Sequence, residues 1–350
     1  MSVTTPSLTE KPFVNNQGEA NYQEKINLIA EKLKSWSGPF VIISHVDPDG
    51  DALGSALALK RVLDALAKDT TLVMDAPKYL QFITKLGELS PPIQRLPENC
   101  LLAILDVADL QRCEGVPLEV VGSAAFTVNI DHHGTNNRFG DLACVEPDKA
   151  ATAQMVKDVI DALEKTTKRS LWTADIATPC LTGILTDTGN FRFGNTSPEV
   201  LRDAGELLQH DVQYVELTDR LQWRHPDYFK MLGKVMGTVE FPLNGLVALA
   251  SMDKKMIAEI GETEDDSSDY VGLIRYAEGV KVAIFLREKD DFTKISMRAR
   301  EGVSAQAICM TLGGGGHVAA AGAKVKGGIE EAKKQILAAT EAELRKHQLL

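Results

Sequence analysis

One short segment of this sequence, Val41–Gly54, concentrates residues that can bind a metal ion. It reads VIISHVDPDGDALG, so an apolar run leads into His45 and then into Asp47, Asp49 and Asp51. Carboxylates packed this densely repel one another unless a cation neutralises them. Aspartate also favours helix starts, which makes an N-cap role the alternative for one of the three. The segment therefore favours a metal site over simple helix capping.

Similar residues follow two other predicted strands. The apolar run 101–105 ends at Asp106, and the run 126–130 ends at Asp131-His132-His133. Neighbouring parallel strands bring their carboxyl ends to one edge, where open α/β sheets bind ligands. Taken singly, Asp106 fits a turn and the two histidines fit a hydrogen-bonded core. Their repetition at strand ends favours one shared site.

A last acid, Asp187, is expected just past an apolar face of the predicted helix 173–186. The candidate metal ligands are His45, Asp49, Asp51, Asp106, His132 and Asp187. Oxygen and nitrogen ligands in this number suit two divalent ions, with Mn²⁺ the best fit and Mg²⁺ or Co²⁺ as competitors. Because no cysteine joins them, structural zinc is disfavoured. Two ions about 3.5–4 Å apart, bridged by a carboxylate, organise in-line attack of a metal-bound hydroxide on phosphorus.

A second candidate site lies near the C-terminus. Four glycines before a histidine let backbone N–H groups approach an anion, and arginine suits bidentate phosphate contact. The candidate substrate-binding residues are Arg298, Gly314, Gly315, Gly316, His317 and Arg192. A bare glycine run also fits a helix end or flexible turn, and Arg192 fits a structural ion pair equally well.

The elements that must position these residues alternate between strand and helix. Strands are predicted at 40–43, 71–74, 101–105 and 126–130, and helices at 22–35, 150–163 and 173–186. This alternation predicts an α/β domain with a mostly parallel sheet flanked by helices.

The pattern changes near residue 237, where hairpins are predicted over 239–251 and 281–298, with a last helix at 329–346. We therefore expect a smaller α+β domain after the first. The expected boundaries are a disordered lead-in over 1–21, a catalytic domain over 22–211, a helical linker over 212–236 and a substrate-binding domain over 237–350.

Composition excludes several classes of protein. The 350 residues carry a net charge of −11, which opposes binding to duplex nucleic acid. No apolar run approaches the roughly 20 residues of a membrane helix, and the N-terminus lacks a signal-peptide pattern. Five dispersed cysteines predict reduced thiols. We expect a cytoplasmic protein without membrane association.

The order of these motifs resembles the DHH phosphoesterase superfamily. The resemblance is carried by His45-x-x-x-Asp49-x-Asp51, Asp106, Asp131-His132-His133 and Asp187. The run Gly313-Gly314-Gly315-Gly316-His317-x-x-Ala320-Ala321-Gly322 is similar to the signature of the DHH-associated C-terminal domain. Covering nearly all of the chain from about residue 22, the resemblance is closest to the oligoribonuclease and pAp-phosphatase type, the nano-RNases.

The resemblance implies a role for each ligand. His45, Asp49 and Asp106 would hold one metal, and Asp51, Asp106, His132 and Asp187 would hold the other, with Asp106 bridging. His133 and Asp131 would be the catalytic pair, His133 facing the substrate phosphate and Asp131 orienting the histidines. Asp47 receives no role. Ala299 departs from the family pattern, which has serine after the arginine, and Arg300 is the neighbour that would compensate.

The implied function is hydrolysis of short single-stranded RNA to mononucleotides together with dephosphorylation of pAp. Two other phosphoesterase functions are alternatives: an enzyme of cyclic-dinucleotide turnover that cleaves pApA, and a RecJ-like single-strand exonuclease. A nucleotide-binding regulatory protein without activity is the alternative from another class. For the oligomeric state, a homodimer is one alternative.

Overall fold

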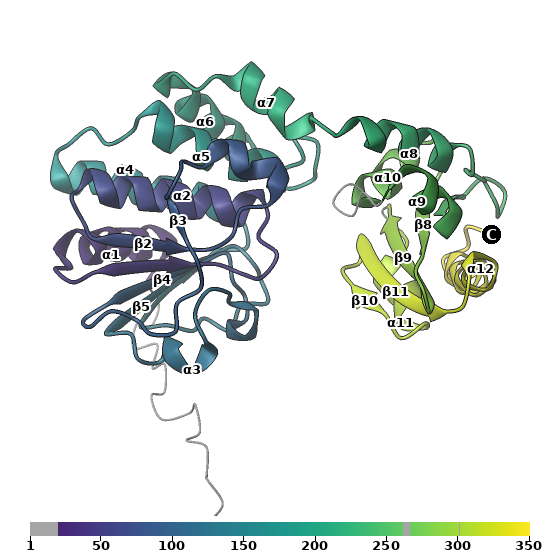
Figure 1. Ribbon diagram of the computed structural model, residues 1–350, viewed down its shortest axis with the longest axis horizontal. Coiled ribbons are helices and arrows are strands. Elements are labelled where there is room, and N and C mark those ends of the chain that lie inside the picture. The colour runs from purple at the N-terminus through teal and green to yellow at the C-terminus, as the bar shows by residue number, and fades with distance from the viewer. Residues whose placement is uncertain (1–19, 262–266, 301) are drawn as a thin grey trace, which may run out of the picture. The chain divides into compact units, whose positions relative to one another are not determined.

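The computed structural model describes residues 20–261, 267–300 and 302–350. It divides into two compact units between Trp223 and Arg224, drawn in Figure 1. Of the expected lead-in, residues 1–19 lie outside this description. Within the expected linker, α7 (Tyr214–Gln222) belongs to the first unit and α8 (Pro226–Met236) to the second.

The first unit is built on a sheet of six strands, and every neighbouring pair is parallel. The strands are β1 (Phe40–Ile43), β2 (Thr70–Val73), β3 (Leu89–Ser90), β4 (Leu101–Leu105), β5 (Phe126–Asp131) and β6 (Leu142–Val145). Their order is β3-β2-β1-β4-β5-β6, so the strand order reverses between β1 and β4. The predicted α/β class is confirmed, while the short β3 and β6 were not predicted.

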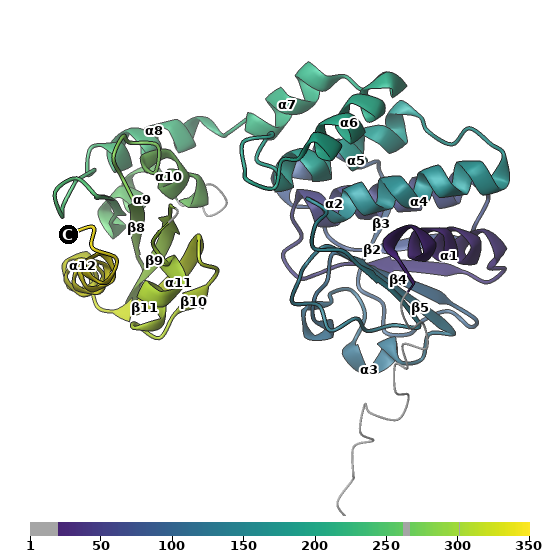
Figure 2. The ribbon, with the colours of Figure 1, turned by 180° about the vertical axis from the view of Figure 1, so that it is seen from behind.

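Helices cover this sheet unevenly (Figures 1 and 2). They are α1 (Tyr22–Ser35), α2 (Gly50–Ala65), α3 (Leu118–Val121), α4 (Thr152–Thr167), α5 (Ala174–Asp187) and α6 (Pro198–Leu207), with 3₁₀ turns η1 (Lys78–Ile83), η2 (Leu110–Arg112) and η3 (Leu208–His210). The helices α1, α2 and α4 share the main core with one sheet face, and α5 packs on α2 and α4. The other face packs against α3 and the loops around it.

The helix α1 illustrates how local sequence sets these elements. Asn21 and Glu24 form a capping box at its start, which satisfies backbone N–H groups that have no intrahelical partner. Ile26, Ile29 and Leu33 recur at helical spacing and are fully buried. The predicted helix 22–35 is confirmed at both ends.

Two glycines let α2 and α5 pack closely. A Cβ atom built on Gly54 would lie 2.3 Å from the backbone oxygen of Pro179. One built on Gly183 would lie 2.6 Å from Cβ of Ala153 and 2.9 Å from Oδ1 of Asp51. Only glycine fits both positions without displacement of backbone. The crossing brings the start of α2 and the end of α5 to the same region.

The second unit is built on a mixed five-stranded sheet of order β10-β11-β9-β8-β7. Its strands are β7 (Val247–Met252), β8 (Val282–Glu288), β9 (Phe292–Ala299), β10 (Gly315–Gly316) and β11 (Ala320–Lys326). Its further helices are α9 (Lys254–Ile260), α10 (Ser267–Ile274), α11 (Ala305–Met310) and α12 (Ile329–Lys346). Residues of α11 and α12 share one core with the sheet, and residues of α8 and α10 share another. A smaller α+β domain is confirmed.

One predicted hairpin forms and the other does not. β8 and β9 pair antiparallel as predicted. The predicted hairpin over 239–251 is wrong, because its strands meet in a single bridge, Glu240 to Leu249, and β7 instead pairs parallel with β8. Pro242 has no N–H to continue the ladder, and positive φ angles at Leu243, Asn244 and Gly245 open the turn.

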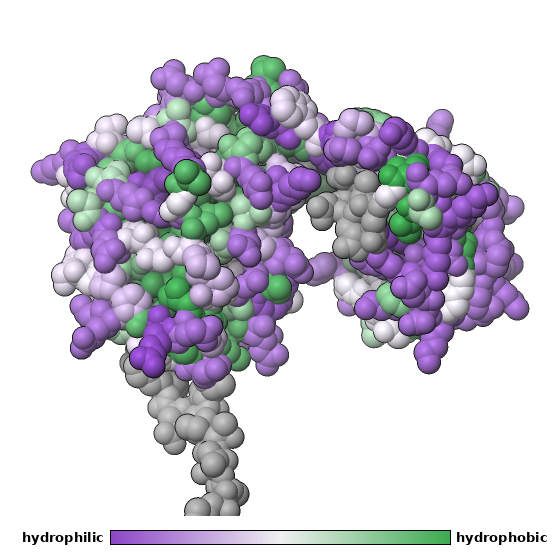
Figure 3. All heavy atoms as spheres, viewed as in Figure 1, coloured by the Kyte–Doolittle hydropathy of each residue, from purple (hydrophilic) through white to green (hydrophobic). Residues whose placement is uncertain are grey.

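The surface is polar over most of the visible face of each unit (Figure 3). In the part of the chain that the structure describes, every helix is too short or too polar to cross a membrane.

Candidate metal centre

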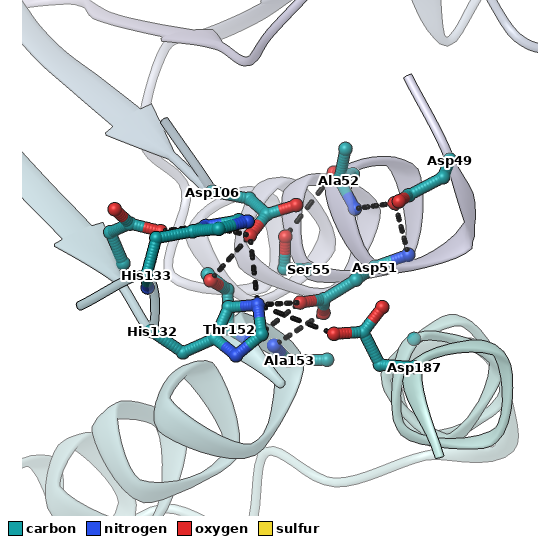
Figure 4. A network of polar contacts seen from close by, with 12 residues as sticks. Asp49, Asp51, Ala52, Ser55, Asp106, His132, His133, Thr152, Ala153 and Asp187 are labelled. Atoms are coloured by element: carbon teal, nitrogen blue, oxygen red, sulfur yellow. Dashed lines mark hydrogen bonds and ion pairs between the residues drawn. The ribbon is translucent and has the colours of Figure 1, made fainter. Parts of the chain in front are cut away.

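The metal-type residues converge where the strand order of the first sheet reverses, the position at which open α/β sheets bind ligands. His45 lies just past β1, and Asp106 immediately follows the adjacent β4. Helix ends supply the rest of the centre, shown in Figure 4. The start of α2 brings Asp49 and Asp51, and α5 ends at Asp187.

A first group combines His45, Asp49 and Asp106, each with a ligand atom within 4.8 Å of the others. Nδ1 of His45 lies 2.8 Å from the carbonyl oxygen of Val46 and can donate to it. This tautomer leaves Nε2 free, and Nε2 lies 3.4 Å from Oδ2 of Asp106. Asp49 is also the N-cap of α2, since its Oδ1 accepts the N–H groups of Asp51 and Ala52. Asp49 is therefore both a helix cap and a candidate metal ligand.

A second group combines Asp51, His132 and Asp187 within the same limit. Nε2 of His132 lies 3.2 Å from Oδ2 of Asp187 and 3.8 Å from Oδ2 of Asp51. It also lies 3.6 Å from Oδ1 of Asp106. The two oxygens of Asp106 therefore face different groups, as a carboxylate shared between two cations must.

The backbone of Asp106 is itself unusual. Its φ angle is +60°, in the left-handed region, where residues with a side chain are disfavoured. Its N–H donates to the carbonyl of Ile130 at 2.9 Å, which continues the pairing with β5. Because sparsely populated backbone conformations gather at functional sites, this turn supports a role beyond connection of two elements.

Burial and mutual repulsion dominate the electrostatics of the acids. Burial, together with the charges of Asp106 and Asp187, raises the pKa of Asp51 well above its usual value. Burial, Asp49 and Asp106 raise the pKa of Asp187 to about 8. Burial would raise the pKa of Asp106, but the three histidines around it, His45, His132 and His133, outweigh burial and lower that pKa.

The pKa values of the two neighbouring histidines, His132 and His133, shift in opposite directions. Burial lowers the pKa of His132. The side chain of Asp131, whose Oδ1 lies 2.7 Å from Nδ1 of His133, raises the pKa of His133 to about 9 against the effect of burial. His133 is also the most exposed of the two, with 38% of its side chain accessible. A partly exposed imidazole with a raised pKa is a suitable donor to an anion.

These residues fit divalent cations. Asp51 and Asp187 have raised pKa values and belong to one ligand group, and a cation there would remove both the repulsion and the tendency to bind protons. The donors are carboxylate oxygens and imidazole nitrogens, which suit hard to borderline divalent ions.

Sequence reasoning missed the residues that hold the ligands. Thr152 donates its hydroxyl to Oδ1 of Asp106 at 2.9 Å. Asn136 donates to Oδ2 of Asp131 at 2.7 Å and so supports the acid beside His133. A hydroxyl residue at the start of a predicted helix was the available signal for Thr152, whereas nothing local marked Asn136.

Asp47, for which the sequence predicted no role, and the predicted substrate contact Arg192 both lie outside the two groups. Asp47 is exposed with φ of +54° and belongs to none of the metal-type clusters found among the described residues. Arg192 is exposed and donates Nε to the carbonyl of Gly189 at 2.7 Å. Among the residues placed by the structure, no carboxylate forms an ion pair with Arg192.

In the second unit, Arg298 and His317 lie in one row across the sheet. Arg298 of β9 pairs with Ala320 of β11, and Ala320 exchanges backbone hydrogen bonds with His317. Residues opposite one another on neighbouring strands project from the same face. Burial and the nearby Arg275 lower the pKa of Arg298, and the ion pairs of the described residues leave its guanidinium without an acid.

The glycine run has a packing reason of its own. A Cβ atom on Gly314 would lie 2.2 Å from the carbonyl oxygen of Gly322, and one on Gly316 would lie 2.6 Å from that of Ala320. Gly315 and Gly316 form β10, which pairs with β11. These glycines are therefore needed for strand pairing, whatever else the loop binds.

Comparisons with known proteins agree with this geometry. Residues 39–184 match the DHH family, N-terminal domain, and residues 247–346 match the DHHA1 domain. The chain is 53% identical, over 94% of its length and 97% of the relative, to the bifunctional oligoribonuclease and PAP phosphatase NrnA of Thermus thermophilus. It is 26% identical to the cyclic-di-AMP phosphodiesterase GdpP of Geobacillus thermodenitrificans, but spans only 47% of that protein.

A solved structure shares the fold. The exopolyphosphatase-related protein from Bacteroides fragilis superposes with a TM-score of 0.83 at 23% identity, over 93% of this chain and 98% of that one.

Proposed function

The chain belongs to the DHH family, and we propose that it is a metal-dependent phosphoesterase that hydrolyses short oligoribonucleotides to mononucleotides and dephosphorylates pAp. The observation that carries the proposal is the placement of Asp106. One of its oxygens faces His45 and the other faces His132. The near full-length similarity to an oligoribonuclease and PAP phosphatase supports this choice of substrate.

Each candidate ligand has a proposed place. His45, Asp49 and Asp106 would hold one cation, and Asp51, Asp106, His132 and Asp187 the other. Two divalent cations there would neutralise phosphate charge and make water a better nucleophile at neutral pH.

The protein's own groups would orient the phosphate. His133, held by Asp131, would donate a hydrogen bond to a phosphate oxygen. Arg298 and His317, which project from one sheet face, would bind a second phosphate or the nucleoside, with the backbone of Gly314, Gly315 and Gly316 beside them. For Arg192, whose exposed guanidinium has no acidic partner among the described residues, contact with phosphate is the favoured role.

The proposal extends to the metal ion, the cellular compartment and the domain boundaries. Mn²⁺ is the preferred ion because carboxylate and imidazole ligands occur together. Free thiols at all five cysteines support a reducing compartment, the cytoplasm. The proposed domains are 22–211 and 237–350, with 212–236 as the linker.

Activity on a substrate panel tests the proposal. With Mn²⁺ present, the chain should release phosphate from pAp and mononucleotides from short RNA. A series of RNA substrates of increasing length, read by product length, shows whether long RNA is degraded too. Cleavage of pApA in strong preference to pAp would favour the cyclic-dinucleotide alternative. Degradation of long single strands would favour the RecJ-like one.

A variant at the shared carboxylate tests the centre. Asp106→Asn keeps the shape of the side chain and tolerates the positive φ angle, but removes the charge. We expect activity on pAp and dinucleotides to fall by a factor of about 10²–10³, the order lost with one essential charge-stabilising group. Circular dichroism should show an unchanged fold. Substantial residual activity would contradict a carboxylate shared by two cations.

A further inference from the structure

The helix α4 starts inside the metal centre and is not capped by its own N-cap residue. That position is Ala151, whose side chain makes no capping hydrogen bond. The N–H groups of Thr152 and Ala153 instead donate to the two carboxylate oxygens of Asp51, at 2.6 and 2.8 Å. Asp51 therefore caps a helix that begins about a hundred residues further along the chain. The same hydrogen bonds thus cap α4 and fix the carboxylate of a candidate ligand.

The hydroxyl of Thr152 reaches a second ligand. It donates to Oδ1 of Asp106 at 2.9 Å, and Figure 4 shows Thr152 next to both carboxylates. All three side chains are buried, with Thr152 and Asp51 fully inaccessible. The same Oδ1 faces Nε2 of His132 at 3.6 Å. One residue of α4 thus contacts a ligand from α2 and a ligand that follows β4.

We propose that Thr152 is a positioning residue of the metal centre. By donating its N–H to Asp51 and its hydroxyl to Asp106, it sets the spacing between a ligand of the second group and the carboxylate that faces both groups. The inference rests on the proposed cation centre and is independent of the proposed substrate. Partners of this kind typically change metal affinity by about 10- to 100-fold.

The alternative role is structural. A buried carboxylate needs hydrogen-bond donors in any case, and Thr152 supplies one. In that case removal of the hydroxyl would change the stability of the fold but leave the affinity for cations unchanged. Metal affinity and stability therefore distinguish the two roles.

Titration of Mn²⁺ into the full chain by calorimetry is the test. Thr152→Val keeps the shape and the backbone N–H but loses the hydroxyl, and should weaken Mn²⁺ binding about 10- to 100-fold. Thr152→Ser keeps the hydroxyl and should restore most of the affinity. Thr152→Ala provides a second variant without the hydroxyl should the valine protein not fold.

The matched control removes a buried threonine hydroxyl elsewhere. Thr340 is fully buried in α12 of the second unit and donates to the carbonyl of Ile336 at 2.7 Å. Thr340→Val should lower the unfolding temperature and leave Mn²⁺ affinity at the wild-type value.

The possible results distinguish failure of the role of Thr152 from failure of the proposed cation centre. Wild-type affinity in Thr152→Val or Thr152→Ala would overturn the positioning role alone, as would an equal loss in the serine and valine variants. A wild-type chain that binds no Mn²⁺ would overturn the cation centre and this inference together.

Discussion

At the scale of single residues, two acids in the same turn have different surroundings. Asp49 caps α2 through one oxygen and lies with His45 and Asp106 in a metal-type group. Asp47, only two positions earlier, is exposed with a positive φ angle and belongs to no such group among the described residues. A dense run of acids therefore identifies the site, but the backbone decides which acids enter it.

Matched substitutions in this turn should separate the two acids. Asp49→Asn keeps the helix cap, since asparagine and aspartate are comparable N-caps, but removes the ligand charge. We expect calorimetry to show Mn²⁺ affinity at least about 10-fold weaker in Asp49→Asn, the order seen when a group that supports a metal is lost. Asp47→Asn, which asparagine tolerates at positive φ, should bind Mn²⁺ as the wild type does.

The stability of these variants is the control. In the presence of a chelator both should unfold within about 0.5 kcal/mol of the wild type, the range of ordinary surface substitutions. Weakened Mn²⁺ binding in Asp47→Asn, with normal binding in Asp49→Asn, would reverse the assignment.

At the scale of elements, the spacing of the ligands depends on how two helices cross. Asp51 lies in the first turn of α2 and Asp187 is the last residue of α5. These helices approach closely where Gly54 and Gly183 leave no room for a side chain. The glycines thus act on the metal centre through helix packing, without contact with a cation.

Alanine in place of one of these glycines should lower the stability of the fold, whereas alanine usually stabilises a helix relative to glycine. Alanine in a helix interior normally stabilises by about 0.5–1 kcal/mol relative to glycine. For Gly54→Ala we expect instead a loss of about 1–3 kcal/mol, because the added methyl group would overlap the carbonyl of Pro179. Urea unfolding followed by tryptophan fluorescence measures it.

Gly205 in α6 provides the comparison, because a Cβ atom there meets nothing within 4 Å. Gly205→Ala should be neutral or slightly stabilising. If both alanine variants proved stabilising, the close crossing of α2 and α5 would be wrong.

At the scale of the whole molecule, the candidate metal ligands and the candidate substrate contacts around the glycine run belong to different units. All the proposed metal ligands precede Trp223, whereas Arg298 and His317 follow Arg224. Each unit has its own sheet and core. The three tryptophans of the chain, Trp36, Trp172 and Trp223, all lie in the first unit, so their fluorescence reports on that unit alone.

Metal binding should therefore stabilise one unit selectively. At a free Mn²⁺ concentration 100 times the Kd, ligand linkage predicts about 2.7 kcal/mol of added stability. The unfolding transition seen by tryptophan fluorescence should move to higher temperature, and a chelator should reverse the shift. A transition that does not respond to Mn²⁺ would contradict a metal centre confined to the first unit.

Local patterns in the sequence predict much of this molecule. Helical spacing gives α1 and α12 their observed bounds, and apolar runs locate β1 and β4, because each pattern depends on neighbours along the chain. The acids at strand ends could be grouped from sequence because parallel strands direct their carboxyl ends to one edge. The strand β3 has only two residues, too few for a recognisable pattern, whereas β6 was missed although its length equals that of β1.

Only the tertiary structure decided how the ligands are held. The contacts of Thr152 with Asp51 and Asp106 span 101 and 46 residues of sequence, and no local pattern encodes such distances. The close approach at Gly54 likewise depends on a helix more than a hundred positions away. Sequence determined which residue types reach the edge of the sheet, whereas packing determined their spacing, because spacing depends on contacts between distant segments.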